Sequence, residues 1–393
     1  MVDTIIQKSW DSLQSFLETS ENIALFYDDD PDGISSGVQL KRLFEKLGKN
    51  VPLLLHFNEK KKPFSEDFIN LLKKHNVDTL VTTDYNIAGF GLYDAYKKCV
   101  ETNDLKVAII DHHNDSADYD NEKTLELNIS KLQNTLVGGQ YCCAKYVNDI
   151  VRAYDTALAD SLAWIATIGI IGDSNAITWK TFVNNTIEKT NSLYVDEKEM
   201  LSINDVDDVY LTPFGMCSNY MFFGIAKGSE EVQRIFDIVD KSPSIFELAK
   251  QLKQYEPIKE EVYDYVENYD YFIKNMGGAL GESNIFELEI KSENKIVSIV
   301  ANLLGYKDKD TIFLVYQKVG DVIFTSIRGG DNAINLGAIL NICCQDIPGA
   351  NGGGHKAAAG AKVPVDSFNT FKDTFYAYFE SKDADKNTKG DEQ

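Results

Sequence analysis

Positive charge is scarce in this sequence of 393 residues. Lysine and arginine together number 39 against 61 aspartates and glutamates, which gives a formal net charge of -22. The averaged field of such a surface repels polyanions, whereas a protein that coats long nucleic acid without specificity is basic. The composition therefore argues against that class of protein and favours short substrates, held locally by metal ions and a few cationic groups. A solubility or salt adaptation of the host explains the acidity equally well.

Cysteine spacings typical of metal-binding or redox motifs are also missing. The six cysteines show no CxxC pattern and include two vicinal pairs, which are poor disulfide partners, so they indicate free thiols in a reducing compartment. The first residues lack the basic start and apolar stretch of a signal peptide, and no apolar run reaches the ~18 residues needed to span a membrane. We therefore expect a cytoplasmic protein without membrane association.

Length and composition predict two folded domains with a cleft between them. Hydrophobic residues make up 44% of the chain and charged residues 25%, which is ordinary for globular proteins. The chain is too long for one ordinary core, since domains usually run to ~100 to 200 residues.

The first half alternates short apolar runs with amphipathic segments, a pattern typical of βαβ units stacked into a parallel sheet. Strands are expected at 22–27, 50–57, 78–84 and 106–113, with helices at 34–48, 92–101, 138–154 and 159–174. The last of these helices is apolar enough to be buried on nearly all sides. The pattern predicts a doubly wound α/β domain with a parallel sheet.

The second half predicts a helical connector and a smaller α/β domain. Strands are expected at 284–290, 310–319 and 321–330, followed by a helix near 334–344, a glycine-rich loop and a final helix at 371–379. We place the domain limits at 1–185 for the first domain, 186–280 for the connector, 281–380 for the second domain and 381–393 for a disordered tail.

A cluster of acidic residues follows the first expected strand. The segment YDDDPDGISS places Asp28, Asp30 and Asp32 on alternate positions. Carboxylates at the carboxyl ends of parallel strands lie where α/β proteins bind ligands, and crowded anions repel one another unless cations neutralise them. Taken alone, the segment fits a divalent-metal site and an acidic turn built on Pro31 and Gly33 equally well.

Polar residues recur at the same position on three other expected elements. LVTTDYN ends an apolar strand at Asp84, VAIIDHHND ends the next at Asp111, His112 and His113, and WIATIGIIGDS ends a buried helix at Asp173. Oxygen ligands with one imidazole suit Mn²⁺ or Mg²⁺ better than a structural zinc ion. Two such ions ~3.5 to 4 Å apart stabilise the attacking and leaving oxygens in phosphoryl transfer. Hydrolysis of a phosphate ester is therefore the predicted chemistry.

The order DxDxDG, TTD, DHH and GDS resembles the four motifs of the DHH phosphoesterase superfamily, which includes RecJ-type exonucleases, nanoRNases and cyclic-dinucleotide phosphodiesterases. The resemblance implies two Mn²⁺ ions bridged by Asp84, with Mg²⁺ as the alternative metal. It also implies that His113 faces the scissile phosphate and that Asp111 orients the histidines. The implied metal ligands are Asp28, Asp30, Asp32, Asp84, His112 and Asp173.

Two positions depart from the pattern of the superfamily. Many relatives begin the first motif with histidine, where this chain has Asp28, an aspartate also found in RecJ-like members. RecJ-like enzymes usually follow the second aspartate with asparagine and glycine, where this chain has Tyr85 and Asn86. We expect the bulk of these two side chains to shorten access to the site.

A second motif pair lies in the smaller domain. SIRGG places Ser326 and Arg328 on an expected strand, and GANGGGHK places a glycine run before His355 and Lys356. Glycine amides and cationic side chains approach an anion closely, and arginine contacts phosphate bidentately. A plain turn and a surface ion pair are the alternatives. Together the motifs resemble the DHHA1 domain, which implies phosphate binding by Arg328, Ser326, Gly353, Gly354 and His355.

The resemblance covers roughly residues 20 to 180 and 285 to 365 and implies a metal-dependent phosphodiesterase. A RecJ-like single-strand exonuclease or a nanoRNase-like oligoribonuclease would release mononucleotides from single-stranded DNA or short RNA. The first alternative is a phosphodiesterase for linear or cyclic dinucleotides, which the acidic surface favours. The alternative of another class is a replisome partner that binds the GINS complex, but the nearly complete acidic set argues for activity. A homodimer is among the oligomeric states left open.

Overall fold

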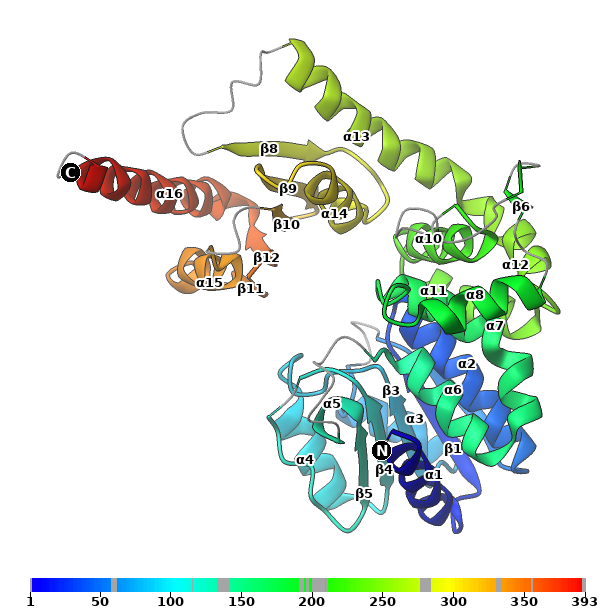
Figure 1. Cartoon of the computed structure of the whole chain (residues 1–393). Helices are drawn as coiled ribbons and strands as arrows, with labels where there is room; N and C mark the ends of the chain where they lie inside the picture. Colours follow the sequence, from blue (N-terminus) through cyan, green and yellow to red (C-terminus); the bar gives the residue numbers. More distant parts are fainter. Residues whose placement is uncertain are drawn as a thin grey trace. The chain divides into compact units, whose positions relative to one another are not determined.

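The computed structural model describes residues 2–57, 62–114, 116–132, 141–190, 194–195, 198–199, 209, 211–275, 284–329, 334–354 and 356–390. The chain divides into two compact units, Met1–Tyr255 (unit 1) and Glu256–Gln393 (unit 2). Each unit contains its own five-stranded sheet (Figure 1). The predicted α/β class, with a parallel-sheet domain and a smaller second domain, is confirmed.

The sheet of unit 1 is parallel throughout and has the strand order β2-β1-β3-β4-β5. The strands are β1 (Asn22–Tyr27), β2 (Asn50–Leu55), β3 (Thr79–Thr83), β4 (Lys106–Asp111) and β5 (Thr124–Asn128). The order of the strands reverses between β1 and β3. In open α/β sheets, ligands bind beyond the carboxyl ends of the strands at such a switch point.

Helices cover both faces of this sheet (Figure 1). On one face α3 (Glu66–Lys74) and α4 (Tyr93–Thr102) pack on apolar residues of β1, β3 and β4, including Phe26 and Ile109. The other group comprises α1 (Val2–Leu17), α2 (Pro31–Lys46), α6 (Cys143–Tyr154) and α7 (Thr156–Gly172), which pack against one another. The predicted buried helix is α7, whose residues from Ile165 to Ile171 are all buried.

Further helices of unit 1 follow α7. They are α8 (Lys180–Lys189), α10 (Pro213–Ile225), α11 (Ser229–Lys241) and α12 (Ile245–Leu252); α5 (Ile129–Leu132) lies earlier, after β5. Helix α10 packs on α7, and α11 packs on α2, where Asp240 pairs with Lys41 and Arg42. Residues 213–252, which fall in the expected connector, are therefore part of the compact body of unit 1. Two short strands, β6 (Tyr194–Val195) and β7 (Lys198–Glu199), pair with each other.

Unit 2 has a mixed sheet with the strand order β11-β12-β10-β9-β8. Its strands are β8 (Ile285–Ile290), β9 (Ile312–Val319), β10 (Val322–Gly329), β11 (Asn351–Gly354) and β12 (Ala358–Pro364), and only the β8–β9 pair is parallel. Helices α15 (Leu336–Gln345) and α16 (Phe368–Gly390) cover one face, where Ile323 and Ile327 of β10 meet Phe371 and Phe375. Helix α14 (Val297–Lys307) contacts β9 and β10, and α13 (Glu256–Asn275) contacts α14.

The glycine-rich segment differs from the loop expected there, because Asn351–Gly354 forms the edge strand β11. Glycine is required here by close packing against α15. A Cβ at Gly352 would lie 2.8 Å from the sulfur of Cys344, and one at Gly337 would lie 2.2 Å from the carbonyl oxygen of Gly354. A glycine run gives no side-chain alternation, so a sequence pattern cannot reveal such a strand.

The tail expected at 381–393 begins within the last turns of α16, whose side chains lie outside the described part of the chain. Residues 391–393 lie outside the described residues altogether. Its disorder stays a prediction, as do the domain limits. Within the part of the chain that the structure describes, no helix is both long and apolar enough to cross a bilayer.

Candidate metal centre

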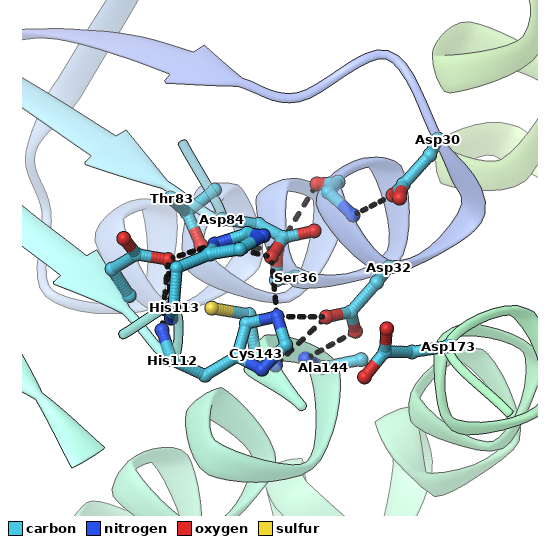
Figure 2. Close-up of polar contacts among 12 residues, drawn as sticks. Asp30, Asp32, Ser36, Thr83, Asp84, His112, His113, Cys143, Ala144 and Asp173 are labelled. Carbon is cyan, nitrogen blue, oxygen red and sulfur yellow. Dashed lines mark hydrogen bonds and ion pairs between the residues drawn. The ribbon is translucent and has the colours of Figure 1, made fainter. Parts of the chain in front are cut away.

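Four polar segments of unit 1 converge beyond the carboxyl ends of β1, β3 and β4 (Figure 2). Asp28 follows β1, Asp84 follows β3, and His112 and His113 follow β4, so they border the switch point of the sheet. Asp173 comes from the end of α7, which reaches the same place because its small residue Gly169 packs against α6 and α2. A Cβ at Gly169 would lie 2.4 Å from Cβ of Ala144 and 3.1 Å from Oδ1 of Asp32.

The first acidic segment holds α2 in place. Asp30 is the N-cap of α2, and its Oδ1 accepts a hydrogen bond from the backbone N–H of Gly33 at 2.8 Å. Pro31 occupies the first helical position, where its missing N–H costs nothing. Asp32 is buried, and its two oxygens accept hydrogen bonds from the N–H groups of Cys143 and Ala144 at 2.8 and 2.7 Å. The carboxylate of Asp32 therefore caps α6, a helix 111 residues away in the chain.

Gly33 allows this segment to turn. A Cβ at Gly33 would lie 2.5 Å from the carbonyl oxygen and 2.7 Å from the nitrogen of Asp28, so the backbone would have to move. We expect Gly33→Ala to lower the affinity for Mn²⁺ by about 10- to 100-fold, the usual effect of disturbing the support of metal ligands. Titration of free Mn²⁺ by electron paramagnetic resonance measures it.

Gly48→Ala is the control for that measurement. Gly48 has a φ of +74°, so alanine is strained there, yet no atom of the described residues lies within 4 Å of the added Cβ. This variant should lose some stability and bind Mn²⁺ like the unaltered chain. Equal losses of affinity in both variants would contradict the steric role given to Gly33.

Asp84 occupies the centre of the site and has unusual backbone geometry. Its φ is +58°, in the left-handed region that aspartate tolerates better than most residues. The side chain is buried, with Oδ1 3.1 Å from Nε2 of His112, and within the described part of the chain this oxygen accepts no well-formed hydrogen bond. A buried carboxylate oxygen without a donor is costly unless a cation contacts it.

The DHH segment is held by hydrogen bonds from neighbouring elements. Oδ1 of Asp111 accepts from Nδ1 of His113 at 2.7 Å and from the backbone N–H of His112 at 2.8 Å. Asn128 donates to the carbonyl of His113 at 2.9 Å, and Ser130 donates to the carbonyl of His112. Asp111 thus orients the ring of His113 directly and reaches His112 only through its backbone.

The ionisation of these groups reflects burial and crowding. Burial, followed by the negative charge of neighbouring carboxylates, raises the pKa of Asp28, Asp32 and Asp84 well above the ordinary value. The same causes raise the pKa of Asp173 to about 7. So many buried carboxylates cannot all be ionised stably at neutral pH without a compensating cation.

The two histidines have opposite shifts. Burial and the adjacent His113 lower the pKa of His112 to about 4, which leaves it neutral, as a metal-binding imidazole must be. Burial works against protonation of His113 too, but the hydrogen bond and charge of Asp111 outweigh it and raise its pKa to about 9. His113 is therefore protonated at neutral pH in the metal-free protein, and its side chain is 38% exposed.

The donor set fits divalent cations. In two groups of three residues, the possible ligand atoms, one from each side chain, all lie within 4.8 Å of one another. One group is Asp84, His112 and His113, and the other is Asp32, Cys142 and Asp173. A third group joins Asp32, Asp84 and Cys143. Asp28 and Asp30 are in none of these groups. Carboxylates with imidazole suit Mn²⁺ and Mg²⁺, while the thiols add softer donors.

Three features of the site were not evident in the sequence. Cys142 and Cys143, two of the six cysteines expected as free thiols, are fully buried and bring their thiols beside the carboxylates. Asp29 pairs with His56, 3.0 Å away, and belongs to none of the three donor groups. The ring of Tyr85, expected to shorten access, is buried against Phe26 and stacks on Phe90. No periodic pattern reports such long-range pairings.

Unit 2 brings together most of the residues predicted to bind phosphate. Arg328, Ser326 and Gly354 line one pocket of about 430 Å³. Gly353 lies on β11 but is not part of the lining, and His355 lies outside the described residues. Nε of Arg328 donates to Asn302, and within the described ranges no carboxylate forms an ion pair with this guanidinium. The surface ion pair considered as an alternative for Arg328 is therefore not observed among the residues that the structure describes.

Comparison with known proteins gives two family matches. Residues 22–170 match the DHH family, N-terminal domain, and residues 282–381 match the DHHA1 domain. None of the curated proteins compared with the chain matches it.

Solved structures of similar fold include three that cover nearly all of this chain. The RecJ complex with Mn²⁺ from Thermus thermophilus has a TM-score of 0.66 and 16% identity, over 96% of this chain and 55% of that chain, so the present chain spans about half of that protein. An exonuclease RecJ bound to manganese has a TM-score of 0.67 and 16% identity, over 95% and 94% of the two chains. CDC45 from Entamoeba histolytica has a TM-score of 0.60 and 11% identity, over 96% and 99%. At these identities the likeness is one of fold.

Proposed function

The chain belongs to the DHH family of phosphoesterases and also carries the DHHA1 domain, and from this premise we propose that it is a two-metal phosphodiesterase acting on nucleic acid. We propose a RecJ-like or nanoRNase-like exonuclease that releases mononucleotides from single-stranded DNA or short RNA. The observation that carries the proposal is the convergence of buried carboxylates and histidines around Asp84, whose Oδ1 accepts no hydrogen bond from the described residues.

Two Mn²⁺ ions, with Mg²⁺ as the alternative, are the metals we assign to this site. Bound there, they would neutralise the carboxylates, polarise the phosphate and lower the pKa of a water molecule to near neutrality. Asp84 belongs to two of the three donor groups, which suits the bridging role. The proposed ligands are Asp28, Asp30, Asp32, Asp84, His112 and Asp173.

The remaining residues bind and orient the substrate. The side chain of His113 is partly exposed, so its ring can donate a hydrogen bond to the scissile phosphate. Asp111 keeps the imidazole in the orientation that presents its other nitrogen. In unit 2 the guanidinium of Arg328, with Ser326, the glycines and His355, binds a phosphate of the nucleic acid.

The test is a time course with Mn²⁺ on end-labelled DNA and RNA oligonucleotides of graded length, down to dinucleotides. Progressive loss of single nucleotides supports an exonuclease and reveals the preferred sugar and direction. Cleavage of dinucleotides alone, linear or cyclic, supports the alternative phosphodiesterase. No Mn²⁺-dependent cleavage of any strand contradicts the proposal.

A replisome role remains a separate proposal, because the likeness to CDC45 concerns the fold. Pull-down with GINS subunits tests it independently of catalysis. A cytoplasmic location is proposed from the six cysteines, all of which are free and buried.

Arg328 provides a test of the phosphate contact. Hydrogen bonds to charged groups contribute about 1.5 to 3 kcal/mol, so Arg328→Ala should raise KM for oligonucleotides by about 10- to 150-fold and change kcat little. Arg328→Lys keeps the charge but loses the planar fork, and it should restore only part of the affinity. Steady-state kinetics measures both.

Arg152→Ala is the matched control for Arg328. Arg152 forms an exposed ion pair with Asp160 in unit 1, so its removal should leave KM unchanged. An unchanged KM in Arg328→Ala would remove the phosphate role from this residue.

A further inference from the structure

Two cysteine thiols of unit 1 lie inside the polar cluster and have no part in the proposed hydrolysis. Cys142 is the N-cap of α6 and Cys143 is its first residue, and both are fully buried. A buried cysteine is usually a small packing residue in apolar surroundings, as Cys99 is in the apolar cluster that contains Phe68 and Tyr96. The sulfur of Cys143 lies instead among aspartates and histidines (Figure 2).

Asp32 holds both thiols at the centre. Its two oxygens accept hydrogen bonds from backbone N–H groups in the first turn of α6 at 2.8 and 2.7 Å, so the start of this helix is tied to the carboxylate. Asp32 also belongs to both donor groups that contain a thiol. Cys142 joins it with Asp173, and Cys143 joins it with Asp84. A cation bound at Asp32 is therefore within reach of a sulfur atom in each group.

The spacing of these atoms fits one metal ion. The ligand atoms of each group lie within 4.8 Å of one another. A Zn–S bond of about 2.3 Å and a Zn–O bond of about 2.1 Å place the ligands of one ion ~3.5 Å apart. The terminal torsion of an aspartate side chain is broad, so a small rotation of a carboxylate closes the difference while the backbone stays in place.

The thiols can give up their protons to a cation at this place. Burial and the nearby carboxylates raise the pKa of both thiols, so they keep their protons in the metal-free protein. The thiol of Cys143 donates a long hydrogen bond, 3.6 Å, to the carbonyl of Ile110, so little is lost when a cation replaces its proton. The N-terminus of α6, a helix of 12 residues, then stabilises the thiolate through its partial positive charge.

A carboxylate oxygen without a hydrogen-bond partner indicates a cation in the same group. Asp84 is 2% exposed, and its Oδ1 accepts no hydrogen bond from the described residues. Asp84 shares a donor group with Cys143. A buried carboxylate oxygen in this state is costly unless a cation contacts it, and beside a thiol the cation can be a soft one.

We propose that Cys142 and Cys143 make the part of the centre around Asp32 a site for a softer divalent cation, Zn²⁺ or its analogue Cd²⁺, bound by thiolate sulfur and carboxylate oxygen. Coordination breaks an S–H bond, and its proton passes to the solvent. Carboxylates suit Mn²⁺ and Mg²⁺, whereas thiolates select zinc, and a given site generally binds Zn²⁺ more tightly than Mn²⁺.

Zn²⁺ in this site should exclude Mn²⁺, because Asp32 is also among the proposed ligands of the catalytic ions. The inference rests on the metal centre of the proposed function and adds to it inhibition by a cation of another class. Its tests measure binding, so they do not depend on hydrolysis.

The first measurement is binding of Cd²⁺ to the full chain, since the bond between Cd²⁺ and a thiolate absorbs in the ultraviolet. The protein is freed of metal and kept reduced with a phosphine. We expect a cadmium–thiolate band that Zn²⁺ removes and that Mn²⁺ removes at higher concentration. In the converse titration Zn²⁺ should release bound Mn²⁺, which appears as the electron paramagnetic resonance signal of the free ion.

Cys142→Ala combined with Cys143→Ala removes both sulfur donors. This variant should lose the band and bind Zn²⁺ more weakly by at least the ~10- to 100-fold that follows from disturbing the support of a metal ligand. Its affinity for Mn²⁺ should change little, because the oxygen and imidazole donors remain. Retained Mn²⁺ binding also shows that the variant folds.

Cys343→Ala combined with Cys344→Ala is the matched control. These two cysteines are also neighbours in the chain and buried, but they lie on α15 of unit 2 and belong to none of the donor groups found among the described residues. The control should keep both the band and the preference for Zn²⁺.

The inference is wrong if the unaltered chain shows no thiolate band, if Mn²⁺ does not compete with the band, or if the control loses it. It is also wrong if the variant at 142 and 143 binds both Mn²⁺ and Zn²⁺ like the unaltered chain. The unaltered chain and the control decide the matter if that variant does not fold. Absence of cleavage by a chain that shows the band would overturn the proposed hydrolysis alone, and cleavage without the band would overturn this inference alone.

Discussion

Asp84→Ala should lower Mn²⁺-dependent cleavage of oligonucleotides by about 10³-fold or more. Asp84 lies at the centre of the candidate site and belongs to two of its donor groups, so its loss removes charge and oxygen donors that no neighbour replaces. Removing one preorganised electrostatic contact already costs ~10² to 10³ in kcat, and a bridging ligand should cost at least as much. The measurement is the rate of nucleotide release from the best substrate of the length series.

The fold should survive this substitution, which separates loss of chemistry from loss of structure. Alanine at a φ of +58° costs about 1 to 2 kcal/mol, but removal of a buried carboxylate among other carboxylates offsets part of that cost. Asp104→Ala is the matched control, because Asp104 is fully exposed and the change in charge is identical. Activity retained by Asp84→Ala, or lost by Asp104→Ala, would contradict the assignment of the site.

The positions of the acidic residues could be predicted because each follows an apolar strand or helix. In a parallel sheet the carboxyl ends of the strands share one edge, so local periodicity alone places Asp28, Asp84 and Asp111 near one another. The observed bounds of β1, β3 and β4 agree with the expected strands to within two residues at each end. In this part of the chain, the strand pattern in the sequence is therefore enough to predict which acidic residues lie at the same edge of the sheet.

Other features depend on contacts between distant segments, which periodicity does not record. Asp32 caps α6, and its role in placing the thiols of Cys142 and Cys143 appears only when α2 and α6 pack together. Strand β11 consists mostly of glycine, and the helices after α8 showed no strong pattern, although α10 and α11 pack on unit 1. In each case the structure is determined by close backbone approach or by tertiary packing.

The two units divide the proposed work in a way that suits an acidic protein. Unit 1 concentrates negative charge where the proposed metal ions would bind, and unit 2 retains an oriented arginine for the proposed phosphate contact. A surface with net charge -22 gives no general attraction for polyanions, so affinity must come from these local contacts. Binding should therefore depend on salt less steeply than in proteins that neutralise many phosphates.

Mn²⁺ should stabilise the folded protein strongly, and more at pH 8 than at pH 6.5. The pKa values of Asp28, Asp32 and Asp84 are raised in the folded state, and that of Asp173 is raised to about 7. A raised carboxyl pKa lowers stability above the ordinary pKa of the group, and this penalty shrinks as the pH falls below the folded value and vanishes near the ordinary one. The protein in EDTA should therefore unfold at a lower temperature at pH 8 than at pH 6.5.

The two histidines do not reverse the expected loss of stability between pH 6.5 and pH 8. His113, with its pKa raised to about 9, loses its stabilising contribution as the pH rises through that value, which adds to the trend. His112, with its pKa lowered to about 4, reduces stability only when the pH falls below its ordinary value of 6.5. The comparison between pH 8 and 6.5 therefore reports on the carboxylates and on His113 together, and both contributions have the same sign.

The size of the metal effect follows from mass action. Mn²⁺ at about 1,000 times its Kd contributes ~4 kcal/mol, which raises Tm by roughly 10 °C for a unit of this size. Protons compete for the same oxygens, so the increase should be clearly smaller at pH 6.5. Calorimetry with and without EDTA at the two pH values measures it.

Asp84→Asn tests whether crowding of the carboxylates lowers the stability of the metal-free protein. Asparagine accepts the left-handed backbone conformation and removes one charge, so the metal-free variant should unfold at a higher temperature than the unaltered chain at pH 8. Its gain in Tm from Mn²⁺ should largely vanish, while Asp104→Asn should behave like the unaltered chain. A metal-free Asp84→Asn protein that is less stable at pH 8, together with an undiminished response to Mn²⁺, would mean that crowding of carboxylates is not what the metal relieves.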